Sequence, residues 1–316
     1  MAARTLAVVS VLAIVIPVFL VIALGAVLTR TRFIGVELIG ELNRLTYYVG
    51  LPAFLFSSIS GATLAGGRSL VVFGVMAGAT LVLIPIGFVV AKLLRMPPAV
   101  VGTFVHAGVR GNLAFVGLPV IALALSVHGA DEVWPVALLA MAPLTMIANI
   151  FGVILLLVGH GKPGPGMVRS LVWQLATNPL LIASGLGAAC AAAGLAFPAW
   201  LAKSLSVTGQ MALPLALLCI GGSLVAIPLR GRRTLATVAS VLKVGVAPLL
   251  GWPLARWFGL SPDETRIALL FLATPAAAAS YTLACKLGGD EALAASSVAI
   301  STALSVVSLS AVLALV

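Results

Sequence analysis

The apolar positions of this chain form long runs, which short polar or Pro/Gly-rich breaks separate. A helix that crosses a membrane needs about 20 mostly apolar residues. Ten segments reach that length, and we expect each of them to be a membrane-spanning helix. They cover residues 6–29, 38–60, 69–91, 99–127, 133–158, 170–194, 199–228, 234–258, 265–285 and 292–315. The pattern therefore predicts an all-α integral membrane protein with ten transmembrane helices and short loops.

The composition supports this fold class and excludes two others. Of the 316 residues, 62% are apolar and only 8% are charged, against about a quarter charged in an ordinary soluble domain. The mean hydropathy is +1.23, so neither a water-soluble enzyme nor a disordered chain fits. The three cysteines (Cys190, Cys219 and Cys285) lie inside apolar runs without metal-ligand spacing, and we interpret them as packing residues.

The net charge of +10 comes from basic residues that are spread between the apolar runs, which favours membrane topology over nucleic-acid binding. With the N-terminus outside, ten basic residues fall in inner loops and five on the outer side. The ten are Arg30, Arg32, Lys92, Arg95, Lys162, Arg169, Arg230, Arg232, Arg233 and Lys286, and the five are Arg4, Arg68, Lys203, Arg256 and Arg266. We therefore expect a plasma (bacterial inner) membrane protein with both termini outside.

The two halves of the chain resemble each other at a nearly constant offset. The Leu-Pro step at Pro52 recurs at Pro214, 162 positions later, and Asp131 in a Gly-Ala-Asp-Glu turn corresponds to Asp290 in Gly-Gly-Asp-Glu. This predicts two repeats, residues 1–159 with spans 1–5 and residues 160–316 with spans 6–10. Five is an odd number, so the second repeat must be inverted, as in many secondary transporters, whose substrate sites lie where helices break near mid-membrane.

Two of the spans contain residues that undermine a continuous helix. Span 4 holds Gly111, Gly117 and Pro119, and span 9 holds Pro275. The repeat offset places Pro119 opposite Ser280–Tyr281. Irregular backbone inside a membrane is tolerated where it is packed in protein or lines a cavity, and half-helix N-termini there would attract an anion. The alternative is that the prolines only bend their helices.

Around the two broken spans the sequence resembles the auxin efflux carrier family, whose members include plant auxin exporters and bacterial dicarboxylate carriers. The stretches that carry the resemblance are Gly111–Pro119, the Leu51-Pro52 and Leu213-Pro214 helices, and Thr274–Ile300. The resemblance implies a five-plus-five inverted repeat, related to bile-acid symporters and sodium/proton antiporters. It also implies that spans 4 and 9 cross, with the substrate beside the crossing.

The same resemblance assigns two crossover positions. The family's crossover Asn falls on Asn112 and its first crossover Pro on Pro119, while Ser280 stands where plant members carry a second Pro. Helices 1, 2, 6 and 7 would form the scaffold.

Two cations lie deep inside predicted spans. Arg110 is about 11 residues into span 4, roughly 16 Å along a helix, and Lys243 is midway through span 8. A buried cation there is costly unless it is paired, and all eight acidic residues lie near span ends. A substrate carboxylate would suit Arg110. The alternatives are capping of backbone carbonyls or a water-filled vestibule for Arg110, and a cavity-facing or packed neutral side chain for Lys243.

Other polar residues complete the candidate site. Asn112 suits either a carboxylate or freed backbone groups, and Gln210 precedes the Leu-Pro step of span 7. His106 is one turn before Arg110 and is either a proton carrier or a packed neutral histidine. Asn178-Pro179 indicates a kink. The predicted substrate-binding residues are Arg110, Asn112, Pro119, Gln210, Lys243, Pro275, Ser280 and Tyr281.

The sequence therefore predicts a secondary transporter or electrogenic exporter for a small organic anion, a mono- or dicarboxylate, without a cofactor or metal and without nucleic acid as a partner. No catalytic motif such as His-Glu-x-x-His or a phosphate-binding loop occurs. Membrane lipids are expected neighbours, and proton or sodium coupling and a homodimer are left open. One alternative is a sodium-coupled symporter of a bile-acid-like anion, and another is a non-transporting receptor or scaffold.

Overall fold

The computed structural model describes residues 2–62, 67–128, 133–157, 169, 172–173, 176–227 and 231–316. Every regular element in these ranges is a helix. The α-helices are α1 (Ala2–Arg30), α2 (Val36–Leu45), α3 (Leu51–Ser60), α4 (Arg68–Leu93), α5 (Pro98–Val109), α6 (Leu118–His128), α7 (Trp134–Leu157), α9 (Pro179–Ala192), α10 (Ala199–Gln210), α11 (Ala212–Ala226), α12 (Arg233–Val241), α13 (Ala247–Trp257), α14 (Pro262–Leu272), α15 (Ala278–Leu287) and α16 (Glu291–Leu315).

Six helical stretches are long and apolar enough to cross a membrane. They are Ala13–Arg30, Arg68–Leu93, Trp134–Leu156, Ala199–Ala226, Arg233–Trp257 and Glu291–Leu315. Three shorter apolar helices accompany them, namely Pro98–Val109, Leu113–Val127 and Pro179–Ala192. The expected all-helical membrane class is confirmed. The predicted repeat boundary at 159/160 lies outside the described residues, as do Asp131, Glu132, Lys162 and Arg230.

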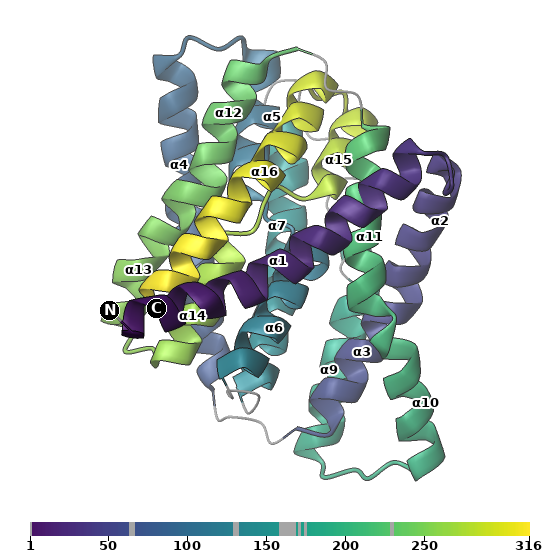
Figure 1. Cartoon of the computed structure of the whole chain (residues 1–316). Coiled ribbons are helices and arrows are strands. Elements are labelled where there is room, and N and C mark those ends of the chain that lie inside the picture. Colours follow the sequence, from purple (N-terminus) through teal and green to yellow (C-terminus); the bar gives the residue numbers. More distant parts are fainter. Residues whose placement is uncertain are drawn as a thin grey trace.

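The helices form two groups that lie side by side (Figure 1). Helices α2, α3, α9, α10 and α11 make one group, in which α3 packs against α9 and α10. Helices α4, α5, α7 and α12–α16 make the other, in which α12 packs on α16 and α4 packs on α7 and α13. Helix α1 runs obliquely across the front of both and packs against α11, and the N- and C-termini lie close together.

A wide π-helical turn precedes a proline in three places. Residues Thr46–Gly50, Leu113–Gly117 and Leu242–Val246 form these turns, and Pro52, Pro119 and Pro248 are the second residues of the helices that follow. A proline lacks the backbone N–H and clashes with the carbonyl four residues earlier. The wider turn accommodates that clash, because the preceding residue bonds five positions back, as Leu118 does to Leu113.

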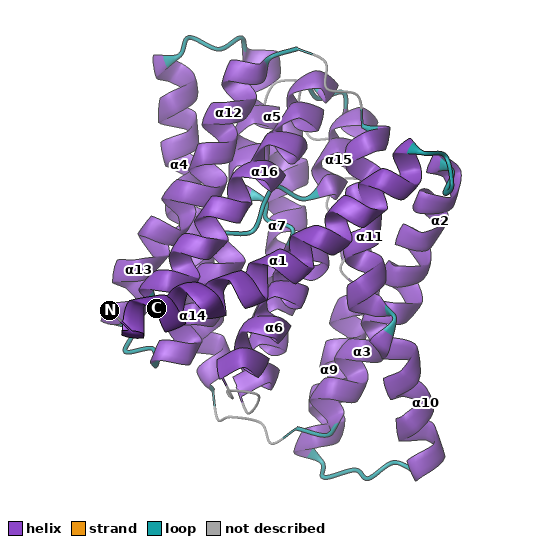
Figure 2. Ribbon diagram, in the orientation of Figure 1, coloured by secondary structure: helices purple, strands orange, loops and turns teal. Residues whose placement is uncertain are grey.

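Two helices are broken inside the molecule, and the breaks cross (Figure 2). Helix α5 ends at Val109 and the next helical turn begins at Leu113, while α14 ends at Leu272 and α15 begins at Ala278. The Asn112 N–H donates to the Pro275 carbonyl (2.8 Å) and the Ala277 N–H donates to the Arg110 carbonyl (3.1 Å). The broken backbones therefore satisfy one another as a short antiparallel bridge between Gly111 and Ala276.

The position of the first break corrects part of the expectation. Pro119 was expected to interrupt span 4, but it lies in the first turn of α6, and the chain leaves the helix earlier, at residues 110–112. Gly111 permits the close approach of the two backbones there, because a Cβ atom at this position would lie 2.5 Å from the Thr274 hydroxyl oxygen and 2.9 Å from Lys243 Cε.

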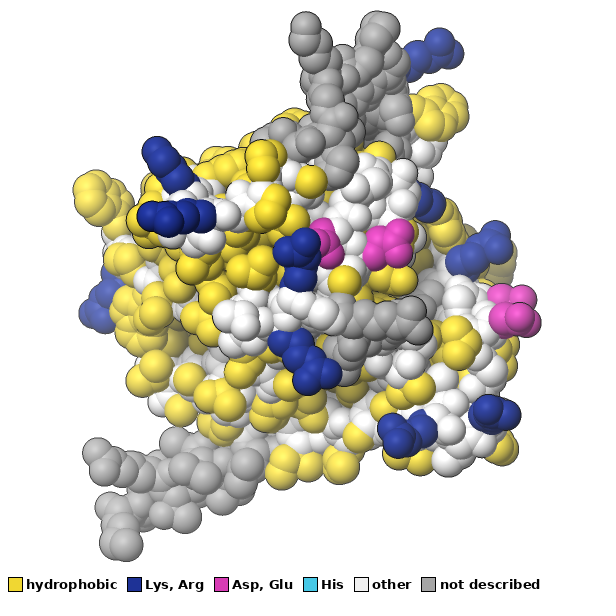
Figure 3. Space-filling model, turned by 90° about the horizontal axis from the view of Figure 1, so that it is seen from above, with side chains coloured by type: hydrophobic (Ala, Val, Ile, Leu, Met, Phe, Trp, Pro, Cys, Tyr) yellow, Lys and Arg dark blue, Asp and Glu magenta, His cyan; other side chains and the backbone are white. Residues whose placement is uncertain are grey.

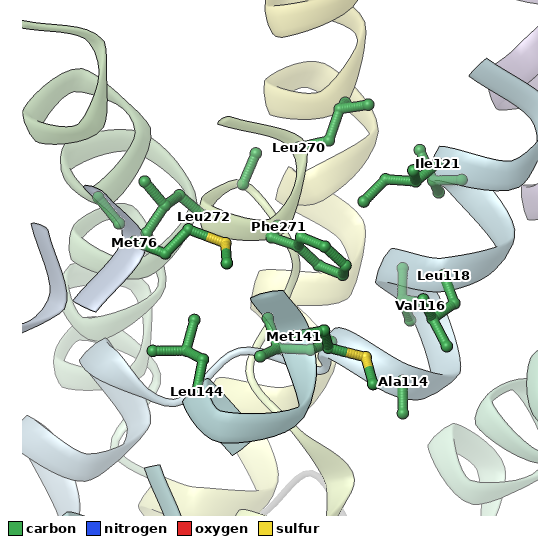
Figure 4. Close-up of a cluster of buried hydrophobic side chains, with 14 of the residues drawn as sticks. Met76, Ala114, Val116, Leu118, Ile121, Met141, Leu144, Leu270, Phe271 and Leu272 are labelled. Carbon is green, nitrogen blue, oxygen red and sulfur yellow. The ribbon is translucent and has the colours of Figure 1, made fainter. Parts of the chain in front are cut away.

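Apolar side chains pack tightly beside the crossing (Figure 4). Met76 of α4, Met141 of α7, Val116 of the π-turn and Phe271 of α14 are fully buried and belong to one cluster, in which Phe271 lies between the others. Inside a membrane this packing stabilises the fold through van der Waals contacts, because lipid tails are as apolar as these side chains. One side of the breaks therefore lies against a closely packed apolar cluster.

The N-terminal end of α14 is fixed by a capped ion pair. The Ser261 side chain accepts from the Glu264 N–H, and the Glu264 carboxylate accepts from the Ser261 N–H and pairs with Arg68 of α4. Arg68 also donates to the Gly259 carbonyl (3.2 Å). These contacts lie just before the predicted span and tie α4 to the first half of the broken helix.

Replacing Glu264 with Gln is expected to lower the melting temperature at pH 7, at a cost of about 0.5–1 kcal/mol. The hydrogen bond from Arg68 lowers the pKa of Glu264 in the folded protein. The carboxylate therefore stabilises the fold at neutral pH, and this contribution is lost as the pH falls through the lowered pKa. Melting curves between pH 6 and pH 3 test this, because the loss falls at and below the ordinary pKa of a glutamate, and a pH dependence as steep in E264Q as in the wild type would contradict it.

One end of the molecule is rich in basic side chains (Figure 3). The C-terminal ends of α1 and α4 and the N-terminal ends of α12 and α16 meet there. The basic residues at these ends are Arg30, Arg32, Lys92, Arg95, Arg232, Arg233 and Lys286. All of them belong to the set predicted for the inner side, so the structure gathers residues that are far apart in sequence at one pole.

Candidate functional site at the helix crossing

Arg110 is placed at the crossing by the end of α5. Its N–H donates to the His106 carbonyl (3.0 Å), and its guanidinium donates from Nη2 to Oδ1 of Asn149 on α7 (2.6 Å). The side chain is half-buried. Helix α5 has 12 residues, so Arg110 lies about 18 Å beyond the start of that helix, roughly halfway through a hydrocarbon core of about 30 Å.

No carboxylate balances this charge among the described side chains. The ion pairs in that part of the chain are Arg68–Glu264, Arg232–Asp290 and Arg266–Asp263, all at helix ends. Asn149 offers Arg110 a neutral oxygen only. A guanidinium with one neutral partner can still take up a carboxylate in a bidentate arrangement.

Polar groups of the neighbouring helix group lie near Arg110. Tyr47, in the π-turn between α2 and α3, lies close enough to Arg110 for an electrostatic interaction, and the Asn178 side chain lies near Tyr47. Asn178 caps α9, because its Oδ1 accepts from the N–H groups of Leu180 (3.0 Å) and Leu181 (3.3 Å). Asn178-Pro179 therefore begins a new helix. Arg110 and Asn149 on one side and Tyr47 and Asn178 on the other span the boundary between the two groups.

Asn112 is the N-cap of the second half of the broken helix. Its Oδ1 accepts from the Phe115 N–H (3.3 Å), and its carbonyl accepts from the N–H groups of Val116 and Gly117. The side chain is 7% exposed. Of the two uses expected for this amide, the structure contains the one that satisfies freed backbone groups.

Lys243 reaches the crossing from the π-turn between α12 and α13. Its Nζ donates to the carbonyl of Leu272, the last residue of α14, and the residue is 2% exposed. A cavity of about 20 Å³ adjoins it, lined in part by Thr80, Gly111 and Phe271. That volume admits one water molecule but no carboxylic acid of metabolite size.

The other predicted site residues lie in different settings. The Pro275 carbonyl takes part in the bridge between the breaks, and Ser280 is buried in α15 with a hydroxyl that has no hydrogen-bond partner. Tyr281 packs with an apolar cluster around Leu156 and Ala284. Gln210 is exposed at the end of α10, a helix that packs on α3 and the Thr46–Gly50 turn.

His106 is packed in the interior between α5 and α7. It is 1% exposed, and its Nε2 has no hydrogen-bond partner and lies against Gly152 of α7. This setting fits a packed histidine that contributes to the α5–α7 contact. Within the described ranges, no group of three or more His, Cys, Asp or Glu residues could hold a metal ion.

Sequence reasoning missed Asn149 and Tyr47 as neighbours of Arg110. Asn149 carries a detectable signal, because it is an amide in the middle of the apolar run Trp134–Leu157. Tyr47 carries a weaker one, since Tyr48 next to it is equally polar and is largely exposed. Only the folded arrangement distinguishes the two tyrosines.

The crossed pair of broken helices, with a guanidinium that meets no carboxylate among the described residues, sets the candidate site apart from ordinary helix packing. Comparison with known proteins identifies the class. The model of the family described as "Membrane transport protein" matches residues 10–160 and 165–313. The chain therefore belongs to this family of integral membrane transporters, which is the auxin efflux carrier family that its motifs resemble. It is not a member of an enzyme family.

A curated relative adds a more specific comparison. The chain is 25% identical over 310 residues to a protein of Rhizobium meliloti (strain 1021) named "Putative malonate transporter". The match covers 96% of this chain and 94% of the relative. The similarity therefore extends through both matched stretches of the family model.

Proposed function

We propose that this protein is a secondary transporter of small organic anions that carry one or two carboxylates, with malonate-like dicarboxylates as the first candidates. The observation that carries the proposal is the half-buried Arg110 guanidinium, which bonds a neutral amide and faces no carboxylate among the described residues. A substrate carboxylate supplies the missing negative charge. The name of the Rhizobium relative supports a dicarboxylate.

The substrate binds between the two helix groups. Arg110 and Asn149 hold its carboxylate from one side, and Tyr47 and Asn178 line the other side. Movement of the α4–α7 and α12–α16 group against α1–α3 and α9–α11 then exposes the site alternately to the two faces of the membrane. This movement opens the space that the substrate needs.

The arrangement is a ten-span inverted repeat, for which the turns give the best support. Leu94, Arg95 and Met96 bond to carbonyls four, three and five residues back, and Phe258, Gly259 and Leu260 repeat this pattern 164 positions later. The helices that follow, α5 and α14, begin at Pro98 and Pro262, again 164 apart, and both are broken at the crossing. An odd number of spans per repeat requires the inversion.

Orientation and energetics follow from charge. The basic pole faces the cytoplasm, which places both termini outside. Moving one charge across 100 mV is worth about 2.3 kcal/mol, so an inside-negative potential favours export of a monoanion by roughly fiftyfold. Import of a dicarboxylate against that potential needs a coupled proton or other cation.

The test is a melting-temperature screen of purified protein followed by flux measurements. Malonate and other small carboxylates are expected to raise the melting temperature, whereas the neutral isostere malonamide is not, because only the native state binds the charged group. Saturable uptake of radiolabelled malonate into proteoliposomes should follow the same rank order. Equal shifts with malonate and malonamide, or no shift with any carboxylate, would contradict the proposal.

A further inference from the structure

The two half-helices that end at the crossing each meet a basic residue. Arg110 follows the last residue of α5, and the Lys243 ammonium bonds the last residue of α14. The C-terminal end of a helix has carbonyls without intrahelical partners and about half a negative charge. Inside a membrane no bulk water reaches such carbonyls. A cation is therefore favourable at both ends.

The settings of the two cations differ. Arg110 is half-buried at the boundary between the helix groups and has donors left for a ligand. Lys243 is 2% exposed and lies deep within one group, beside a cavity that holds at most one water. The Lys243 ammonium therefore serves the protein itself and is not available to a substrate in this conformation.

The surroundings of the Lys243 ammonium are oxygen-rich, and no carboxylate of the described ranges pairs with it. The Leu272 carbonyl accepts its hydrogen bond, Thr80 lines the adjoining cavity, and Thr274 Oγ1 lies beside the same face of Gly111 as the ammonium. Carbonyl and hydroxyl oxygens of this kind are ligands for hard cations. Without the lysine side chain, the C-terminal end of α14 and several oxygens would surround this position, and no positive charge would balance them.

We propose that Lys243 is a tethered cation, which fills the place that an exchangeable monovalent cation would have to occupy at the crossing. Transport is consequently independent of sodium. The proposal rests on the proposed transport function, and it makes Lys243 a positioning residue, because it acts on the substrate site through α14 and the bridge to Arg110. The covalent tether spares the protein the uptake and release of an ion in each cycle.

The experiment compares Lys243→Gln and Lys243→Ala with the wild type in sodium, lithium and choline media. Wild-type malonate uptake into proteoliposomes should be the same in all three media. K243Q keeps a hydrogen-bond donor without the charge and should lose at least tenfold in uptake in choline. K243A opens space for a small ion, so sodium or lithium should restore at least a third of wild-type uptake, and choline should not.

Melting temperatures measure cation binding directly, so they test the proposal even if a variant transports poorly. Sodium or methylammonium should raise the melting temperature of K243A by several degrees relative to choline and leave the wild type unchanged. Wild-type uptake that requires sodium, or K243Q uptake at the wild-type level, would overturn the proposal. So would a folded K243A that no small cation stabilises or reactivates.

Failure of the proposed function is distinguishable from failure of this inference. If no carboxylate shifts the melting temperature of the wild type, the substrate assignment fails, while the cation dependence of K243A stability still reports on Lys243. If carboxylates bind the wild type but K243A shows no cation effect in either assay, the tethered-cation role alone is wrong.

Discussion

Replacing Arg110 with Gln is expected to reduce malonate transport by about tenfold to 150-fold. Hydrogen bonds to charged groups contribute about 1.5–3 kcal/mol each, and the described part of the chain offers no second guanidinium at the boundary between the helix groups. Gln keeps a donor for Asn149, so the variant should fold. Arg110→Lys should retain a fraction of the activity, because it keeps the charge but loses the bidentate geometry.

The measurements for Arg110 are substrate-induced melting shifts and uptake into proteoliposomes at matched membrane potential. Arg44→Gln is the matched control, since Arg44 is an exposed residue in the last turn of α2, and removing its charge should leave uptake unchanged. If R110Q binds and transports malonate as the wild type does, Arg110 is not the carboxylate ligand and the site must be sought elsewhere.

Replacing Gly111 with Ala is expected to destabilise the protein by about 1–3 kcal/mol, the usual cost of overpacking a tight interior. The new methyl group would lie 2.5 Å from Thr274 Oγ1 and 2.9 Å from Lys243 Cε. Neither neighbour can yield easily, because the threonine hydroxyl bonds the Phe271 carbonyl (2.6 Å) and the lysine bonds Leu272. The two broken backbones would have to separate, which weakens their bridge.

Thermal unfolding in detergent tests this effect, with Gly74→Ala as the control. Gly74 lies inside α4, and a Cβ atom there would meet no heavy atom within 4 Å. Alanine favours helix by about 1 kcal/mol relative to glycine, so G74A should be neutral or stabilising. A G111A protein as stable as the wild type would show that the crossing is looser than the geometry indicates.

The all-helical membrane class was predictable because membrane helices are recognised by their length and apolarity. The breaks were also predictable to within a few residues, since Gly111 and Pro275 are unusual inside spans. The error at Pro119 has a physical cause. The tendency of proline to break helices does not determine whether the helix ends at the proline or continues through a wider turn. The outcome depends on how closely a neighbouring backbone must approach the helix at that point.

The partners of the interior cations were not predictable. Lys243 was recognised as an isolated cation, but its bond to Leu272 depends on which half-helix ends beside it. The same is true of Tyr47 and Asn149, which come from different helix groups and meet only at Arg110. The offset between repeats, 162 at the Leu-Pro steps and 164 at the turns before α5 and α14, does not determine such contacts.

The wide turns before Pro52, Pro119 and Pro248 have a consequence for every map of this protein's lipid-facing surface. Each wide turn takes up one more residue than an ordinary helical turn, which rotates all later side chains by about 100° relative to an unbroken 3.6-residue period. A helical wheel drawn through residues 36–60 therefore assigns the outward stripe wrongly beyond position 50. Probes that scan these helices with spin labels or cysteines should find the periodicity of accessibility restarting at Leu51, Leu118 and Ala247.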